Sequence, residues 1–309
     1  MNFLFSIVIP VCNEKDSLRE LTKKVQTRLS SFKKPYEIIF IDDGSTDTSL
    51  DVLNDLKRHF ENISVYSFRK NVGKTYALML GFSKAKGEYI VTLDADLQDD
   101  PQSIKELFSK IKRGNYDLVT GWRKDRKDSF KKKILSSFSN KIISTLFDLK
   151  IHDLNSGIKI YKSSVAKDLK LYGGMHRFIP LIASEMGYKV GETEVLHLER
   201  RYGESKYKMT KFISDIPDLI SVYFLTRYTR RPLHFFGKFG SLVFLIGFIF
   251  FIYLGFSWLG GNPIGTRPLF LFALILILTG IQIVFTGVIA DLIINKGFRD
   301  DDIFPLKYD

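Results

Sequence analysis

Two carboxylates, Asp94 and Asp96, follow the apolar residues 89–93, and the amide of Gln98 comes two residues later. The apolar run predicts a buried strand, and the carboxyl ends of such strands line the sheet edge where α/β proteins bind ligands. Hard oxygen atoms at this spacing suit a divalent cation that neutralises a diphosphate. The segment therefore predicts a site for a metal ion and a phosphate-bearing substrate.

Polar side chains also follow the first two predicted strands. Residues 6–10 run into Asn13 and Glu14, and residues 36–41 run into the sequence D-D-G-S that begins at Asp42. Each segment also has an ordinary explanation, because Asn13 can cap a helix, Asp42 can begin a turn, and lone D-x-D triplets are common. Three successive strand ends carry such side chains, however, so we expect them to converge on one pocket.

Two common phosphate-binding motifs are missing from the sequence. No G-x-G-x-x-G follows the first predicted strand, and no G-x-x-x-x-G-K-[ST] occurs anywhere in the chain. Rossmann dehydrogenases and P-loop enzymes are therefore disfavoured. The phosphates of a substrate must be held by a metal ion and by side chains instead of a glycine-rich loop.

The first 121 residues alternate between strand and helix patterns. The predicted strands are residues 6–10, 36–41, 63–68, 89–93 and 117–121, and the predicted helices between them are residues 15–29, 46–60, 75–85 and 101–113. Strands joined through helices of this length form right-handed crossovers. We therefore predict an α/β fold with a doubly wound, mostly parallel sheet.

The second half of the chain contains segments that are predicted to lie on or cross a membrane. A basic helix is predicted near residues 128–153, and apolar residues on one helical stripe at 206–231 predict helices lying in the membrane interface. Residues 239–259 and 268–290 carry no charge and are long enough to span a bilayer as a hairpin. The predicted parts are a catalytic domain, interfacial helices, the hairpin and a tail, at residues 1–205, 206–236, 237–295 and 296–309.

The charge distribution indicates both an orientation and a partner. Four basic residues precede the hairpin and two follow it, whereas its connector holds only Arg267. The positive-inside rule then places both termini and the catalytic domain in the cytoplasm, at the inner membrane. The formal net charge is +12, and basic residues concentrated at 123–141 and 227–238 favour anionic lipid or phosphate substrates. No aromatic stacking platform accompanies the charge, so nucleic acid is not the expected partner.

Five motifs together identify a known group of enzymes. They are P-x-x-N-E at residues 10–14, D-D-G-S at 42–45, D-A-D-L-Q at 94–98, D-x-x-S-G at 153–157 and R-x-x-G-E-S-K-Y at 200–207. With them the chain resembles inverting family-2 glycosyltransferases of GT-A fold, in the group of dolichol-phosphate mannose synthases and bactoprenol glucosyltransferases. The resemblance extends over essentially the whole chain and includes the two-span tail.

The resemblance implies a role for each matching residue. Pro10, Asn13, Glu14, Asp42 and Asp94 would bind the nucleotide sugar, together with Arg200, Ser205 and Lys206. Asp94, Asp96 and Gln98 would hold Mg²⁺ or Mn²⁺, and Asp96, Arg123 and Asp153 would be catalytic. Arg123, Lys132 and Ser136 would bind the acceptor phosphate, with Lys131 or Lys133 as substitutes for Lys132. Asp153 has three open interpretations, namely a base, a ligand of a substrate hydroxyl, or a cap of the turn at residues 155–157.

The implied reaction moves a hexose from a nucleotide sugar to a polyprenyl phosphate. UDP-glucose as donor and undecaprenyl phosphate as acceptor are preferred by analogy, with N-acetylhexosamine and mannose as alternatives, and a homo-oligomer is expected. A polysaccharide synthase is less favoured because the chain has no Q-x-x-R-W motif. A non-catalytic lipid-binding scaffold is disfavoured because D-A-D-L-Q is present.

Overall fold

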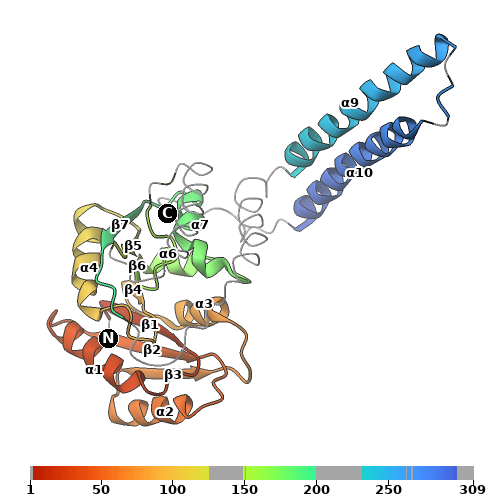
Figure 1. Ribbon diagram of the computed structural model, residues 1–309. Helices are drawn as coiled ribbons and strands as arrows, with labels where there is room; N and C mark the ends of the chain where they lie inside the picture. Colours follow the sequence, from red (N-terminus) through yellow and green to blue (C-terminus); the bar gives the residue numbers. More distant parts are fainter. Residues whose placement is uncertain are drawn as a thin grey trace. The chain divides into compact units, whose positions relative to one another are not determined.

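The computed structural model describes residues 3–124, 149, 151–199, 232–261, 263–265 and 267–297, with side chains up to residue 293. The chain divides into two compact units, Met1–Val222 and Tyr223–Asp309, which are described separately below (Figure 1). The predicted helices near residues 128–153 and 206–231 lie largely outside the described residues. Residues 149 and 151–153, at the end of the first of these segments, are not helical.

The first unit is built on a sheet of seven strands in the order β3-β2-β1-β4-β6-β5-β7. The strands are β1 (Phe5–Val11), β2 (Tyr36–Asp42), β3 (Ile63–Ser67), β4 (Tyr89–Thr92), β5 (Leu118–Trp122), β6 (Lys159–Lys162) and β7 (Val190–Glu194). Strand β6 is antiparallel to both of its neighbours, and every other pairing is parallel. The predicted mostly parallel sheet is confirmed, and six strands end at the same edge.

Helices cover both faces of this sheet, as expected for a doubly wound fold (Figure 1). Within the described residues of the first unit, the helices are α1 (Leu18–Ser30), α2 (Ser49–His59), α3 (Lys74–Lys84), α4 (Ile104–Arg113), α6 (Ser163–Asp168) and α7 (Ile179–Glu185), with short 3₁₀ turns η1 (Pro101–Ser103) and η2 (Met175–Phe178). On one face, Phe5 of β1 packs against Phe108 of α4 with ring centroids 5.0 Å apart. On the other face, α3 lies close to β1, because a Cβ added at Gly81 would come 2.2 Å from Val8 Cγ1.

Strand β6 matters most for the position of the site. Because it runs against its neighbours, it begins at the edge where they end, and Lys159 is its first residue. The loop before it, residues 153–158, is therefore brought to the carboxyl ends of β4 and β5. No pattern in the sequence predicted a reversed strand between these two.

The second unit contains a hairpin of two long apolar helices, α9 (Pro232–Leu259) and α10 (Pro268–Gly297). Both are long and apolar enough to cross a membrane, and only 11% of the apolar window of each is buried. Apart from Pro232 at the start of α9, the buried residues recur every seven positions, at Gly240, Gly247 and Leu254 on α9 and at Ala273, Gly280 and Gly287 on α10. A Cβ added at Gly280 would lie 2.6 Å from the backbone nitrogen of Phe244, so small residues let the two backbones approach closely.

Candidate active site

The loops after β1 and β2 are tied to each other by Asn13. Its side-chain Oδ1 accepts a hydrogen bond from the Thr46 amide at 2.7 Å, and its own amide donates to Ser45 Oγ at 2.9 Å. The Glu14 amide donates to Ser49 Oγ at 2.9 Å. Asn13 has a φ of +55°, a conformation that asparagine tolerates better than most residues. Two of the predicted nucleotide-binding segments are thus brought together and fixed.

Asp42 at the end of β2 is 1% exposed, and both of its carboxylate oxygens are engaged. Ser67 Oγ donates to Oδ2 at 2.7 Å, and the Ser45 amide donates to Oδ1 at 3.2 Å. The carboxylate therefore anchors the D-D-G-S turn from within. The expected contact of Asp42 with a nucleoside is not tested by this arrangement and stays a prediction.

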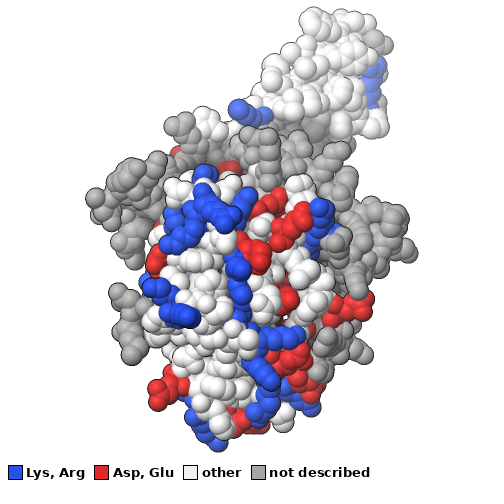
Figure 2. Space-filling view, turned by 90° about the vertical axis from the view of Figure 1, so that its left-hand side faces the viewer, with Lys and Arg blue, Asp and Glu red and all other residues white. Residues whose placement is uncertain are grey.

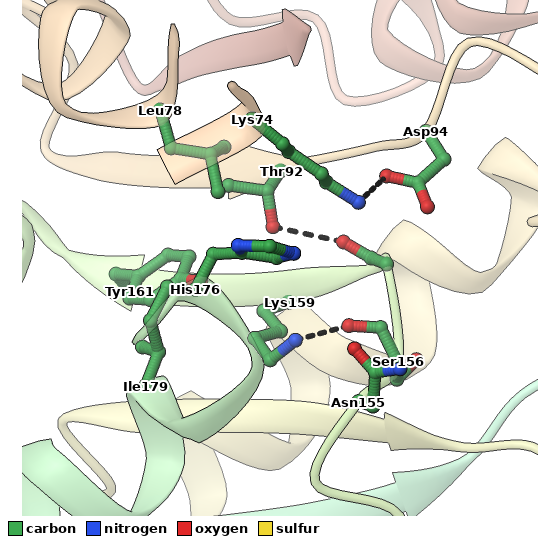
Figure 3. Close-up of a pocket in the computed structure, with 11 residues that line it drawn as sticks. Lys74, Leu78, Thr92, Asp94, Asn155, Ser156, Lys159, Tyr161, His176 and Ile179 are labelled. Atoms are coloured by element: carbon green, nitrogen blue, oxygen red, sulfur yellow. Dashed lines mark hydrogen bonds and ion pairs between the residues drawn. The ribbon is translucent and has the colours of Figure 1, made fainter. Parts of the chain in front are cut away.

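The neighbouring Asp43 positions a cation that sequence reasoning missed. Its carboxylate accepts hydrogen bonds from the amides of Val72 and Gly73, at 2.8 to 3.1 Å. These amides precede α3, so the carboxylate fixes the helix start and meets the positive end of its dipole. Lys74, the first residue of α3, extends its ammonium to Asp94 Oδ1 at 2.5 Å (Figure 3). Despite the opposing effect of burial, this ammonium lowers the pKa of Asp94.

The loop of residues 94–99 turns sharply beyond β4. Leu97 has a φ of +61°, and Asp96 Oδ1 accepts a hydrogen bond from the Gln98 amide at 3.2 Å. The carbonyl of Gln98 in turn accepts from the Leu198 amide at 2.8 Å. Asp96 and Gln98 are partly exposed, whereas Asp99 is 3% exposed.

Asp99 is a second residue that the sequence reasoning missed. Burial, together with the carboxylates of Asp94 and Asp96, raises the pKa of Asp99 to about 7. Its Oδ1 accepts no hydrogen bond from the described residues. A Cβ added at Gly157 would lie 2.4 Å from Asp99 Oδ2 and 2.6 Å from Asp94 Oδ2, so the two carboxylates converge on this glycine.

Converging carboxylates of this kind fit a hard divalent cation. Asp99 Oδ1 accepts no hydrogen bond from the described residues and lies 3.9 Å from His197 Nδ1, which is consistent with a ligand position. Lys74 already neutralises part of the charge on Asp94. Within the described residues, no three His, Cys, Asp or Glu side chains are close enough to hold a metal ion by themselves. The donor set thus fits a metal that takes its remaining ligands from substrate, water or an amide.

Arg123 and Asp153 form a buried ion pair at the end of β5. Arg123 donates from Nε to Asp153 Oδ2 at 2.7 Å and from Nη2 to Oδ1 at 3.0 Å, and Nη2 also donates to the Asn155 carbonyl at 3.0 Å. The side chains are 11% and 5% exposed. A two-point pair of this kind is among the stronger hydrogen-bonded arrangements, and it fixes the orientation of the guanidinium. The structure thus brings together two predicted catalytic residues.

A small pocket opens beside Asp94 (Figure 3). It is lined by Lys74, Leu78, Thr92, Asp94, Asn155, Ser156, Gly157, Lys159, Tyr161, His176 and Ile179. Lys159 donates to the Ser156 carbonyl. Burial and repulsion from Lys74 lower the pKa of Lys159 to about 8.

His176 is held in one orientation within this pocket. Thr75 Oγ1 donates to the Gly173 carbonyl at 2.6 Å and lies 2.8 Å from His176 Nδ1. Because the hydroxyl proton is already used, we assign the imidazole proton to Nδ1, which leaves Nε2 as an acceptor. Burial and the Lys74 ammonium lower the pKa of His176 to about 2, so the ring is neutral.

Several predicted residues lie outside the described part of the chain. They are Lys132 and Ser136, with their possible substitutes, and Arg200, Ser205 and Lys206. The described residues 197–199 lead directly to Arg200, and they cross the loop after β4 through the isolated bridge between Asp99 and His197. Pro10 lies within β1, paired with Ile41 of β2.

Charged side chains of both signs share the surface of the protein. On the face shown in Figure 2, lysines and arginines lie beside aspartates and glutamates instead of forming one unbroken basic patch.

Comparison with known proteins decides the family. The profile described as "Glycosyl transferase family 2" matches residues 6–170, which include the strand ends described above. The chain belongs to this family. The expected relationship and the GT-A fold are both confirmed.

Two relatives match nearly the whole chain. The chain is 38% identical over 301 residues to a dodecaprenyl-phosphate galacturonate synthase of Rhizobium johnstonii, with 96% of this chain and 89% of the relative covered. It is 36% identical over 291 residues to an undecaprenyl-phosphate 4-deoxy-4-formamido-L-arabinose transferase of Edwardsiella ictaluri, with 93% and 88% covered. The two relatives differ in the sugar that their names give.

A solved structure shares the fold of the first unit. Glucosyl-3-phosphoglycerate synthase from Mycobacterium tuberculosis, in complex with Mn²⁺, UDP-glucose and phosphoglyceric acid, superposes with a TM-score of 0.57. The sequences are 16% identical, and the match covers 72% of this chain and 79% of that chain. At this identity the likeness concerns the fold alone.

Proposed function

We propose that this glycosyltransferase moves a sugar from a nucleotide sugar to the phosphate of a polyprenyl phosphate, with inversion at the anomeric carbon. The observation that carries the proposal is the convergence of Asp94, Asp99 and the Arg123–Asp153 pair at one sheet edge, in a chain with two candidate membrane spans. The names of both relatives support a polyprenyl phosphate as acceptor.

The acceptor requires little activation by the protein. A phosphomonoester has a second pKa of about 6, so it is mostly dianionic at neutral pH and needs no strong general base. It needs cations that hold it in line with the anomeric carbon. Arg123 is suited to this task because Asp153 fixes its guanidinium, and the predicted partners Lys132 and Ser136 would complete the acceptor site. Asp153 is then a positioning residue, since a carboxylate that is paired at two points is a poor base.

The leaving nucleotide diphosphate must also be stabilised as its charge grows. Lys74 lies at the start of α3, directly beside Asp94. Its ammonium could pair with a diphosphate oxygen when the donor binds. Mg²⁺ or Mn²⁺ would take its protein ligands from among Asp94, Asp96, Gln98 and Asp99, and would complete its shell with oxygens of substrate or water. The bound cation would supply charge neutralisation of the leaving group. Arg200, Ser205 and Lys206 remain proposed contacts to the diphosphate, and Asn13, Glu14 and Asp42 to the nucleoside.

A UDP-hexose is our proposed donor class, with UDP-glucose as the reference donor. The relatives named for galacturonate and for formamido-arabinose show that this group uses different sugars, so the neutral hexose is only one option. We place the reaction at the cytoplasmic face of the inner membrane, with both termini in the cytoplasm, and propose a homo-oligomer.

A screen of nucleotide sugars tests this proposal. The purified full-length protein would be incubated with each donor and a short polyprenyl phosphate, with and without EDTA. We expect metal-dependent transfer of one sugar to the lipid and its loss in Asp96→Asn, which should also bind Mn²⁺ more weakly in titrations without substrate. A protein that transfers sugar equally well in EDTA would contradict the metal role, and one that transfers none would refute the function. A non-catalytic scaffold predicts neither transfer nor metal-dependent cleavage of a nucleotide sugar.

A further inference from the structure

Lys159 is a buried lysine that makes no ion pair with a described residue, although Asp153 and Asp94 lie near enough to attract its charge. It is 4% exposed, and its ammonium donates only to the carbonyl of Ser156. The other cations at the site are paired with carboxylates, Lys74 with Asp94 and Arg123 with Asp153. A buried charge that lacks a partner is expensive to maintain, so its presence at a pocket indicates a ligand of opposite charge.

The surroundings of Lys159 suit a sugar ring. The pocket is lined mainly by polar side chains, which suit the hydroxyl groups of a sugar. His176 Nε2 offers an acceptor for a sugar hydroxyl, and Thr92 adds a hydroxyl group to the lining. Asp94 belongs both to this pocket and to the proposed metal site, so the pocket adjoins the place of the leaving diphosphate (Figure 3).

We infer that Lys159, assisted by Lys74, binds the carboxylate of a hexuronic acid, so that the donor is a nucleotide-activated uronate. This inference rests on the proposed function and names the class of its donor sugar. An ammonium at this position would pair with the carboxylate on C5 of the ring. A neutral hexose has a hydroxymethyl group there, which leaves the buried charge without a partner. Sites of this kind reject the analogue that lacks the recognised group by large factors.

Matched donors test the inference. Full-length protein in nanodiscs would receive UDP-galacturonic acid, UDP-glucuronic acid, UDP-galactose or UDP-glucose, together with a short polyprenyl phosphate, and kcat/KM would be compared. We expect at least one uronate to be preferred over its neutral counterpart by about 100-fold or more. Lys159→Met should reduce this preference to about 10-fold or less, by lowering kcat/KM for the uronate alone.

Two controls separate recognition from folding. Lys162→Met makes the same substitution three positions along β6, at a lysine paired with Asp117, and should keep the wild-type preference. UDP alone lacks the sugar, so it should bind wild type and Lys159→Met with equal affinity.

Preference of the wild type for a neutral hexose would overturn the inference while leaving the proposed function intact. The inference would also be overturned if Lys159→Met lowered kcat/KM equally for both donors, or weakened the binding of UDP. Lys159 would then bind the diphosphate or stabilise the fold. Transfer from none of these four donors, but from another nucleotide sugar, would overturn the inference alone. Transfer from no nucleotide sugar in the broad screen would refute the proposed function itself.

Discussion

At the level of single residues, the site is made of charged side chains, and only some of them could be predicted from the sequence. Asp94, Asp96 and Arg123 were predictable because each directly follows an apolar strand pattern. Asp99, Lys74 and Lys159 were not singled out, since a lone charge beside a strand usually lies on a solvated surface. The signal for Asp99 was its place immediately after D-A-D-L-Q, and the signal for Lys159 was a lysine that opens the apolar pair Ile160 and Tyr161.

The Arg123–Asp153 pair yields a prediction about acceptor binding. In Asp153→Asn the guanidinium keeps its charge but loses a two-point partner, so it is no longer held in one orientation. We expect the KM for polyprenyl phosphate to rise by about 10-fold or more, with the KM for the nucleotide sugar nearly unchanged. Breaking a buried pair should also destabilise the protein by about 3 kcal/mol. Initial rates measured with each substrate varied in turn give both KM values. A rise in the KM for the nucleotide sugar alone would contradict the assignment.

The lowered pKa of His176 leads to a prediction of how the stability of the protein depends on pH. Its pKa is lowered by burial to about 2, whereas the unfolded chain takes up a proton near pH 6.5. The neutral ring therefore contributes stability above pH 6.5 that is lost progressively as the pH falls below that value. The loss approaches about 1.4 kcal/mol per pH unit. Denaturant unfolding of wild type and His176→Gln between pH 5 and 8 measures the difference. At pH 5, about 1.5 units below the unfolded pKa, the wild type should have lost about 2 kcal/mol more than the variant. Parallel pH curves for the two proteins would contradict the assignment.

At the scale of elements, the strands and helices up to residue 122 followed from apolar periodicity and turn residues. The reversed strand β6 did not, because four residues carry too little pattern to show their direction. This strand brings Asp153, Gly157 and Lys159 to the site. The apolar pattern of the sequence thus predicts the D-x-D loop but not the residues that the reversed strand brings beside it.

The helical hairpin offers a matched pair of substitutions. Gly280→Ala would place a Cβ 2.6 Å from the Phe244 backbone, whereas a Cβ at Gly255 would meet nothing within 4 Å. We expect Gly280→Ala to destabilise the hairpin by about 1–3 kcal/mol. Gly255→Ala should be neutral or slightly stabilising because alanine favours helix. Unfolding in mixed detergent micelles compares the two, and equal stabilities would exclude the close helix contact.

At the scale of the whole molecule, a soluble-type α/β unit and an apolar hairpin share one chain. The predicted orientation can be tested because Cys12 is the only cysteine. In a Cys12→Ser background, Gly265→Cys on the exposed connector should react with a membrane-impermeant maleimide in intact bacterial cells. Glu61→Cys, on the surface of the first unit, should react only after lysis. The opposite labelling pattern would place the catalytic unit outside the cytoplasm.

The central claim is that the sheet edge transfers a sugar to a lipid phosphate, and the stoichiometry of the products tests it most directly. Purified protein would be given its nucleotide sugar and a polyprenyl phosphate, and the released nucleoside diphosphate and the lipid product would be quantified by mass spectrometry. We predict equal amounts of the two, with the lipid heavier by one sugar unit attached through its phosphate. Release of the nucleoside diphosphate with free sugar and an unchanged lipid would contradict the account.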